Sequence, residues 1–114
     1  MAKAVIIKID GTKSIVEFTN ETCYKVLSGA VGGYVESIQL KDETTLWVNE
    51  TGKLDLLKQN SIATAIFANN YGLLDYVVGD AIFTGGIDNE GEIIGLTDEE
   101  VLALLDFNDR IILE

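Results

Sequence analysis

The sequence predicts an α+β fold, in which about two to three helices pack on one side of a mostly antiparallel sheet of about five to six strands. Apolar, β-branched runs alternate along the chain with segments whose apolar residues recur at helical spacing. Asp10-Gly11 is a strong hairpin signal, which favours antiparallel pairing of the runs on either side of it. The 114 residues contain no proline and no low-complexity tract, so we expect a single domain over residues 1–114.

The first half of the chain predicts two hairpins separated by a helix. Strand-like runs at 4–9 and 14–18 flank the turn DGTK. The segment NETCYKVLSGA has helical spacing, Asn20 is its candidate cap, and the glycines that follow end it. A strand over 34–40, the turn KDE and the partner strand TTLWVN form the second hairpin.

A helix and a buried strand follow in the second half. Asn60 or Ser61 caps a helix through IATAIFANN, which ends by Gly72. The nearly continuous apolar run at 76–84 predicts a central strand that is buried on both faces. Gly79 inside this run indicates a bulge or a close approach by other backbone.

The C-terminal region predicts a short strand, a helix and an edge strand. EIIGL is the short strand, and the tail IILE is the edge strand. Between them, Thr97 and Glu100 have the spacing of a capping box, which opens a helix. The expected buried face of this helix comprises Val101, Leu102, Leu104 and Leu105.

The net charge of −11 is concentrated near the C-terminus, because residues 75–114 hold eleven acidic residues and one base, Arg110. No cluster of cations is present, so we expect no direct contact with nucleic acid. The acidic segment is either a solubilising surface or a docking surface for a basic partner protein. No apolar run approaches the roughly 20 residues that span a bilayer, and no signal peptide is recognisable, so we expect a cytoplasmic protein without membrane contact.

Motifs for catalysis and metal binding are nearly absent. The chain has no histidine, which excludes Ser–His and Cys–His nucleophilic sites and the usual zinc sites. Its one cysteine, Cys23, excludes an internal disulfide. We therefore expect no catalytic residues, no metal site and no cofactor. A site built from carboxylates alone, acting as acid and base or holding Mg²⁺, stays open.

A polar cluster is expected at the end of the second hairpin that lies far from its turn. On a strand over 34–40, Glu36 lies on the more apolar face, where a carboxylate is costly without a partner. Pairing around KDE brings this region toward Asn49 and Glu50. The candidate ligand-binding residues are Tyr34, Glu36, Asn49, Glu50, Lys53, Asn60 and Thr64. Their polar groups suit a small polar ligand such as a nucleotide or ribose.

A purely structural role accounts for several of the same residues. Glu36 then accepts hydrogen bonds from backbone groups or pairs with Lys53. Asn49 ends its strand in a turn, and Asn60 caps a helix. The sequence leaves both interpretations open.

Four segments in this order, GGYVE, VNETGKL, N-x-x-AT and VVGDAIF, resemble the signature of an uncharacterised family of small proteins from phages, prophages and mobile elements. The resemblance covers residues 24–105 and leaves the N-terminal hairpin, residues 1–18, outside. The family is recorded as a domain of unknown function, so it implies no catalytic role. What the resemblance implies is a phage or prophage context in a bacterial cell.

We therefore expect a non-enzymatic accessory protein that binds a small polar ligand. Its most concrete form is an anti-defence sponge that sequesters a nucleotide-derived host immune signal. The alternatives are an acidic inhibitor or DNA mimic that uses residues 75–114 against a host protein, and a carboxylate- or Mg²⁺-dependent enzyme. Edge strands and exposed apolar faces favour self-association, so a homo-oligomer is also expected.

Overall fold

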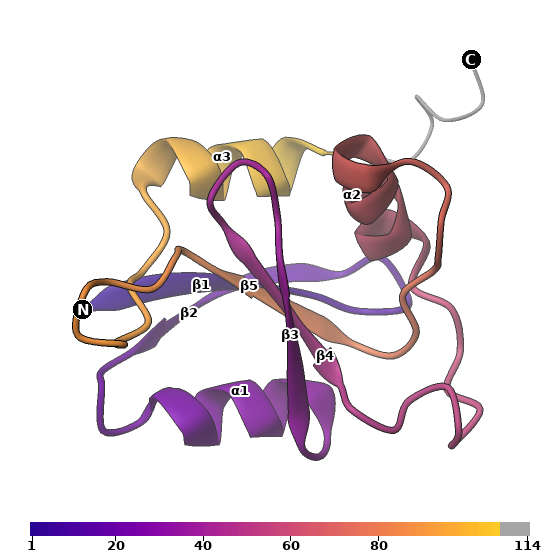
Figure 1. Cartoon of the computed structure of the whole chain (residues 1–114), viewed down its shortest axis with the longest axis horizontal. Coiled ribbons are helices and arrows are strands. Elements are labelled where there is room, and N and C mark those ends of the chain that lie inside the picture. The colour runs from indigo at the N-terminus through magenta and orange to yellow at the C-terminus, as the bar shows by residue number, and fades with distance from the viewer. Residues whose placement is uncertain (108–114) are drawn as a thin grey trace.

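Among the residues that the structure describes, the sheet has five strands in the order β2-β1-β5-β4-β3, and every pairing is antiparallel (Figure 1). The structure is a computed structural model that describes residues 1–107. The strands are β1 (Ala2–Ile7), β2 (Lys13–Phe18), β3 (Val35–Gln39), β4 (Thr45–Asn49) and β5 (Ala81–Thr84). Together with the three helices within residues 1–107, they confirm the predicted α+β class.

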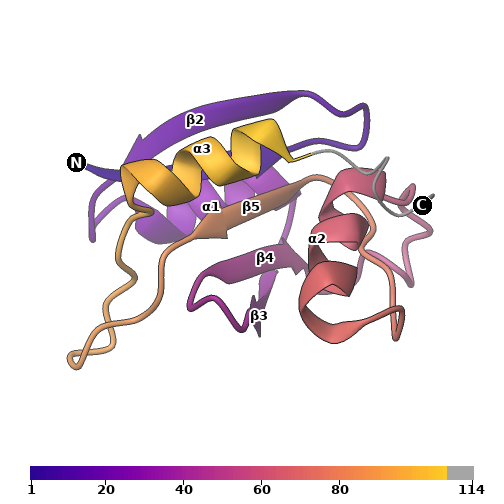
Figure 2. The same cartoon turned by 90° about the horizontal axis from the view of Figure 1, so that it is seen from above.

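Helices cover both faces of the sheet, so the expected placement on one side is wrong. Helix α1 (Cys23–Val31) packs on one face, and α2 (Ser61–Tyr71) and α3 (Asp98–Asp106) pack on the other (Figure 1, Figure 2). The reason lies in the central strand β5, which is buried throughout: Ile82 faces the α1 side, and Phe83 faces the α2 and α3 side. A strand that is apolar on both faces requires a cover on each.

The core therefore forms two layers. On the α1 side, Phe18, Leu27 and Trp47 pack together, and the Trp47 indole N–H donates to Thr84 Oγ1 at 2.9 Å. The opposite layer is larger, and Ile7 contributes to it from β1. Each large apolar side chain buried in this way contributes about 1.5–3 kcal/mol to stability.

Two of the three helices within residues 1–107 start at the local sequence signal that predicts them. The capping box of α3 is confirmed, since Thr97 accepts from the Glu100 N–H and Glu100 accepts from the Thr97 N–H. Asn60 caps α2. For α1 the predicted cap Asn20 is wrong, because the cap position is Thr22, whose side chain accepts no hydrogen bond from the helix.

Several expected elements are shorter than the sequence pattern predicts. The apolar run at 76–84 is central in the sheet, but only its last residues form β5. Gly79 has a φ of 77°, and a Cβ there would lie 2.9 Å from the Leu57 side chain, so its close neighbour is a side chain and not backbone. EIIGL forms only one bridge, between Ile87 and Ile93, instead of a strand.

Two further expectations concern the C-terminal region. Leu102 is 59% exposed and does not belong to the buried face of α3, whereas Val101 and Leu104 do. The tail IILE lies outside the described residues.

Within residues 1–107, no helix combines the length and the apolar character needed to cross a bilayer.

Candidate functional site

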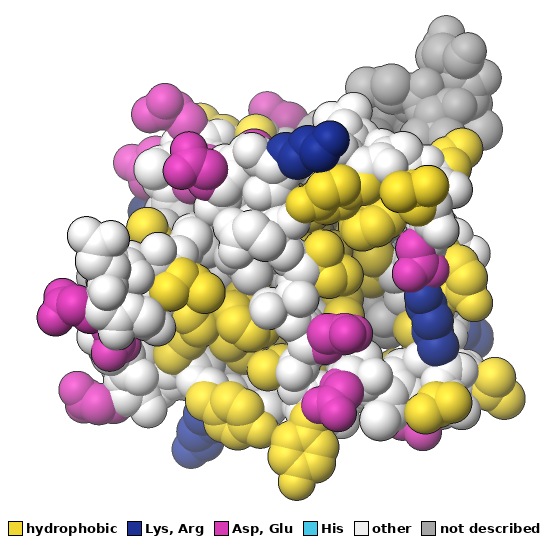
Figure 3. All heavy atoms as spheres, viewed as in Figure 1, with side chains coloured by type: hydrophobic (Ala, Val, Ile, Leu, Met, Phe, Trp, Pro, Cys, Tyr) yellow, Lys and Arg dark blue, Asp and Glu magenta, His cyan; other side chains and the backbone are white. Residues whose placement is uncertain are grey.

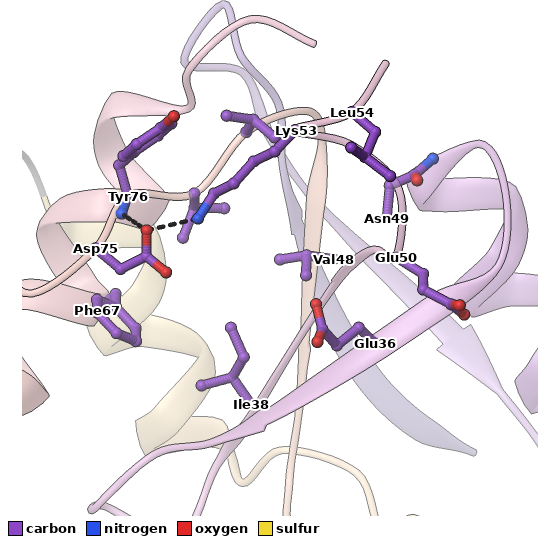
Figure 4. Close-up of a pocket in the computed structure, with 12 residues that line it drawn as sticks. Glu36, Ile38, Val48, Asn49, Glu50, Lys53, Leu54, Phe67, Asp75 and Tyr76 are labelled. Atoms are coloured by element: carbon purple, nitrogen blue, oxygen red, sulfur yellow. Dashed lines mark hydrogen bonds and ion pairs between the residues drawn. The ribbon is translucent and has the colours of Figure 1, made fainter. Parts of the chain in front are cut away.

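A cavity of about 140 Å³ opens at the end of the β3–β4 hairpin that lies far from its turn (Figure 4). Its walls come from β3 and β4, the loop that follows β4, helix α2 and the segment 75–78. The lining residues are Glu36, Ile38, Val48, Asn49, Glu50, Lys53, Leu54, Phe67, Asp75, Tyr76, Val77 and Val78. Four of the seven candidate residues are among them.

Glu36 reaches the cavity because of the hairpin register. It pairs with Val48, and Ile38 stands two residues further along β3, so these three side chains share one face. Figure 4 shows the Glu36 carboxylate turned toward the cavity. Glu36 is exposed to solvent, which removes the burial cost expected from the sequence. Within residues 1–107 its carboxylate forms no hydrogen bond or ion pair, so it is open to a ligand.

Lys53 pairs with Asp75 and not with Glu36. Its ammonium lies 2.5 Å from Asp75 Oδ1 and 4.6 Å from the centre of the Tyr76 ring. The Tyr76 N–H donates to the same carboxylate at 2.8 Å. Lys53 first, and this N–H second, hold the pKa of Asp75 below its ordinary value. Lys53, the one cation among the described residues that line the cavity, is therefore already neutralised.

The floor of the cavity is apolar. Val48, Val77 and Val78 are buried, and Phe67 and Ile38 are half-buried against the core. Apolar walls of this kind accept a ring or an aliphatic group, and a few polar groups at the edge then fix its orientation.

Asn49 and Glu50 line the cavity but turn their polar ends away from it (Figure 4). The Asn49 amide donates to the Val31 carbonyl at 3.1 Å and accepts from the Thr51 N–H at 2.9 Å. A Cβ on Gly33 would lie 2.9 Å from this amide, which explains the need for glycine there. Asn49 therefore shapes the turn that closes the cavity.

Asn60 and Thr64 lie elsewhere, with structural contacts. Asn60 is fully buried; its Oδ1 accepts from the Ala63 N–H at 3.0 Å, and its Nδ2 donates to the Ile7 and Gly79 carbonyls at 2.8 and 3.0 Å. Thr64 Oγ1 accepts from the Val77 N–H at 2.9 Å. The Thr64–Val77 bond holds the cavity wall 75–78 against α2, and Asn60 joins the start of α2 to β1 and Gly79; neither side chain lines the cavity.

Tyr34 also lies outside the cavity. Its side chain is 74% exposed and borders a separate surface depression beside Tyr24 and Gly33. Only its backbone contributes to the site, because the Tyr34 carbonyl accepts from the Glu50 N–H at 2.9 Å.

Residues 2–109 match the sequence profile of a family described as "Domain of unknown function (DUF3846)". The chain belongs to the DUF3846 family. The matched range includes the N-terminal hairpin and therefore extends beyond the 24–105 resemblance. No curated protein and no solved structure matches the chain.

In this DUF3846 member, sequence reasoning missed Phe67, Asp75 and Tyr76 as cavity residues. The sequence pattern assigns Phe67 only to the apolar face of a helix and Asp75 only to the acidic segment. The Lys53–Asp75 pair joins two loops that are 22 residues apart, and no local pattern signals such a contact.

The acidic residues of the DUF3846 chain are spread over several elements and not gathered in one row. Figure 3 shows them over α3, over the loop that follows β5 and near the cavity. Several have partners within the chain: Asp80 accepts from the Ile9 N–H, Asp88 accepts from the Glu92 N–H, and Asp98 pairs with Lys3. Residues 1–107 contain no group of three or more acidic or cysteine side chains placed to hold a metal ion.

Proposed function

We propose that this protein binds, without catalysis, a small molecule that has a ring and N–H donors, of the nucleobase or nucleoside class. The unpaired Glu36 carboxylate above an apolar floor carries the proposal. A carboxylate oxygen accepts hydrogen bonds from the N–H edge of a base, while Val48 and Phe67 offer surface to its ring.

The size of the cavity supports a single ring system. A cavity of about 150 Å³ accommodates one benzene molecule, and this cavity has a volume of about 140 Å³. A ribose or any further part of the ligand then extends past Leu54, which is 83% exposed at the mouth.

The charges around the cavity favour a base over a phosphate. Among the lining residues that the structure describes, Glu36, Glu50 and Asp75 contribute three negative charges, and the only cation, Lys53, is paired. A phosphate group would be repelled here unless it stayed in solvent. In the proposed phage setting, a sponge for a nucleotide-derived immune signal would therefore hold the signal by its base.

The direct test is an amide chemical-shift titration with the four common nucleosides, their monophosphates and cyclic dinucleotides. We expect shifts at Val48 and Val78, with weaker binding for each monophosphate than for its nucleoside. Glu36→Gln should raise the Kd at least about tenfold, because it removes the charged acceptor. Glu17→Gln, an equivalent exposed change on β2, is the matched control and should leave the Kd unchanged. Shifts at none of the cavity amides with any ligand would overturn the proposal.

A further inference from the structure

The outer edge of β3 carries backbone groups at Val35 and Ser37 that form no hydrogen bond within residues 1–107. The Tyr34 carbonyl accepts from Glu50, and the Leu40 N–H donates to Thr44, both at 2.9 Å. In an antiparallel ladder, such bonds alternate, so the even-numbered residues of β3 bond to β4. The N–H and C=O groups of Val35, Ser37 and Gln39 therefore point away from the sheet.

Helix α2 covers only the far end of this edge. The Tyr71 hydroxyl donates to the Gln39 carbonyl, and the Asn70 side chain accepts from the Lys41 N–H at 2.9 Å. The bond to Gln39 also confirms that the odd-numbered residues face outward. Val35 and Ser37 remain open beside the cavity.

The open edge has only one charged side chain, Glu36, among the features that usually prevent strand addition. β3 has the sequence VESIQ, which contains no lysine and no proline, and its register with β4 is continuous, without a bulge. The opposite edge strand β2 differs, because Lys13 donates there to the Leu104 and Leu105 carbonyls at the end of α3.

Charge indicates which kind of strand the edge accepts. A strand that bonds antiparallel to Val35 and Ser37 places one of its residues directly opposite Glu36. The two residues then form a non-hydrogen-bonded pair, in which the side chains lie closer together than in a hydrogen-bonded pair. In a two-fold pairing of two copies centred on Glu36, this residue would be the second Glu36, and like charges in that position are destabilising. A lysine or arginine there would instead be attracted by Glu36 and by the overall charge of −11.

We propose that the β3 edge is a strand-addition site for an extended basic segment of a partner protein. Main-chain bonds to Val35 and Ser37 align the segment, a basic side chain lies against Glu36, and a neighbouring side chain on the same face enters the cavity. The last contact rests on the proposed function of the cavity, whereas the strand pairing does not.

The test uses an acetylated octapeptide that alternates lysine with threonine or valine, titrated against the whole protein by NMR. We expect shifts at the Val35 and Ser37 amides, and a Kd at least about tenfold lower than for the same peptide with glutamate in place of lysine. Ser37→Pro removes one outward N–H and no bond to β4, and it should raise the Kd at least about tenfold. Glu17→Gln on β2 is the control and should not change the Kd of the lysine peptide.

A second reagent leaves the protein unaltered, in case the proline variant does not fold. Two octapeptides are compared, one N-methylated at the odd-numbered residues and the other at the even-numbered residues. Their Kd values should differ, because the backbone N–H groups of only one of these sets face β3. Equal Kd values for the two N-methylated peptides would overturn the strand-addition site, and so would a Kd that Ser37→Pro leaves unchanged. Self-association of the protein through β3 that excludes the peptide would overturn it as well. If the peptide fails to bind while the Ser37→Pro protein still binds nucleosides, the strand-addition site is refuted and the cavity proposal is not.

Discussion

Replacing Asn60 by alanine removes three hydrogen bonds from the interior of the protein. The side chain is 0% exposed, accepts from the Ala63 N–H, and donates to the Ile7 and Gly79 carbonyls. It joins the start of α2 to the end of β1 and to the segment before β5. The substitution therefore loosens the support of the cavity wall without touching the cavity.

The expected loss of stability follows from these contacts. Loss of the helix cap costs about 1 kcal/mol. Each of the two buried bonds to carbonyls contributes about 1 kcal/mol, and more where the carbonyl finds no other donor. We expect the free energy of unfolding to fall by about 3 kcal/mol, a large part of the 5–15 kcal/mol typical of a domain.

Urea unfolding followed by the fluorescence of the buried Trp47 measures this loss. Asn69→Ala is the matched control, because Asn69 is exposed on the same helix, and it should change the free energy of unfolding by less than about 0.5 kcal/mol. An Asn60→Ala protein within about 1 kcal/mol of the wild type would refute the assignment of these three hydrogen bonds as stabilising contacts.

Three further substitutions test the cavity wall, the packing of the sheet and the end of α1. The lowered pKa of Asp75 means that its pairing stabilises the folded state above the unfolded-state pKa of about 3.9, and that this contribution is lost as the pH falls through the folded-state pKa. Lys53→Met should therefore reduce the free energy of unfolding at pH 7 by at most about 1 kcal/mol, since the pair is exposed, and by less at pH 3. Gly85→Ala should cost at least about 2 kcal/mol, because its Cβ would lie 2.4 Å from the Gly95 carbonyl oxygen. Gly32→Ala should cost about 1 kcal/mol, since only its positive φ of 78° opposes a side chain.

Urea titrations at both pH values decide these cases. A difference between Lys53→Met and the wild type that stays constant from pH 7 to pH 3 would contradict the assignment of the Asp75 pKa shift. Gly85→Ala and Gly32→Ala proteins of equal stability would contradict the close approach of the backbone at Gly85.

Local signals in the sequence predict much of the fold. The Asp10-Gly11 turn, the capping box at Thr97 and the hairpin of β3 with β4 depend on residues close in the sequence, and the structure contains each of them. The apolar run at 76–84 already predicts a strand that needs a cover on each face, so the expected placement of the helices on one side did not follow from it. What the run does not indicate is which helix covers which face, because that depends on tertiary packing.

The candidate site likewise combines contacts that the sequence predicts with contacts that it does not predict. The hairpin register places Glu36 near Asn49 and Glu50, as the strand pattern predicts. The cap signal of Asn60 was compatible with either a ligand or a structural role, and burial decides where the side chain points. The contact between Lys53 and Asp75 depends on the path of two loops, which tertiary packing determines.

The most direct test of the central claim is the detection of intermolecular NOEs between a nucleoside and a protein with ¹³C-labelled methyl groups. The account predicts NOEs from the base protons to the methyl groups of Ile38, Val48 and Val78, and their loss in Glu36→Gln but not in Glu17→Gln. NOEs confined to methyl groups elsewhere, such as that of the exposed Ile15, or none at all at saturating nucleoside, would contradict it.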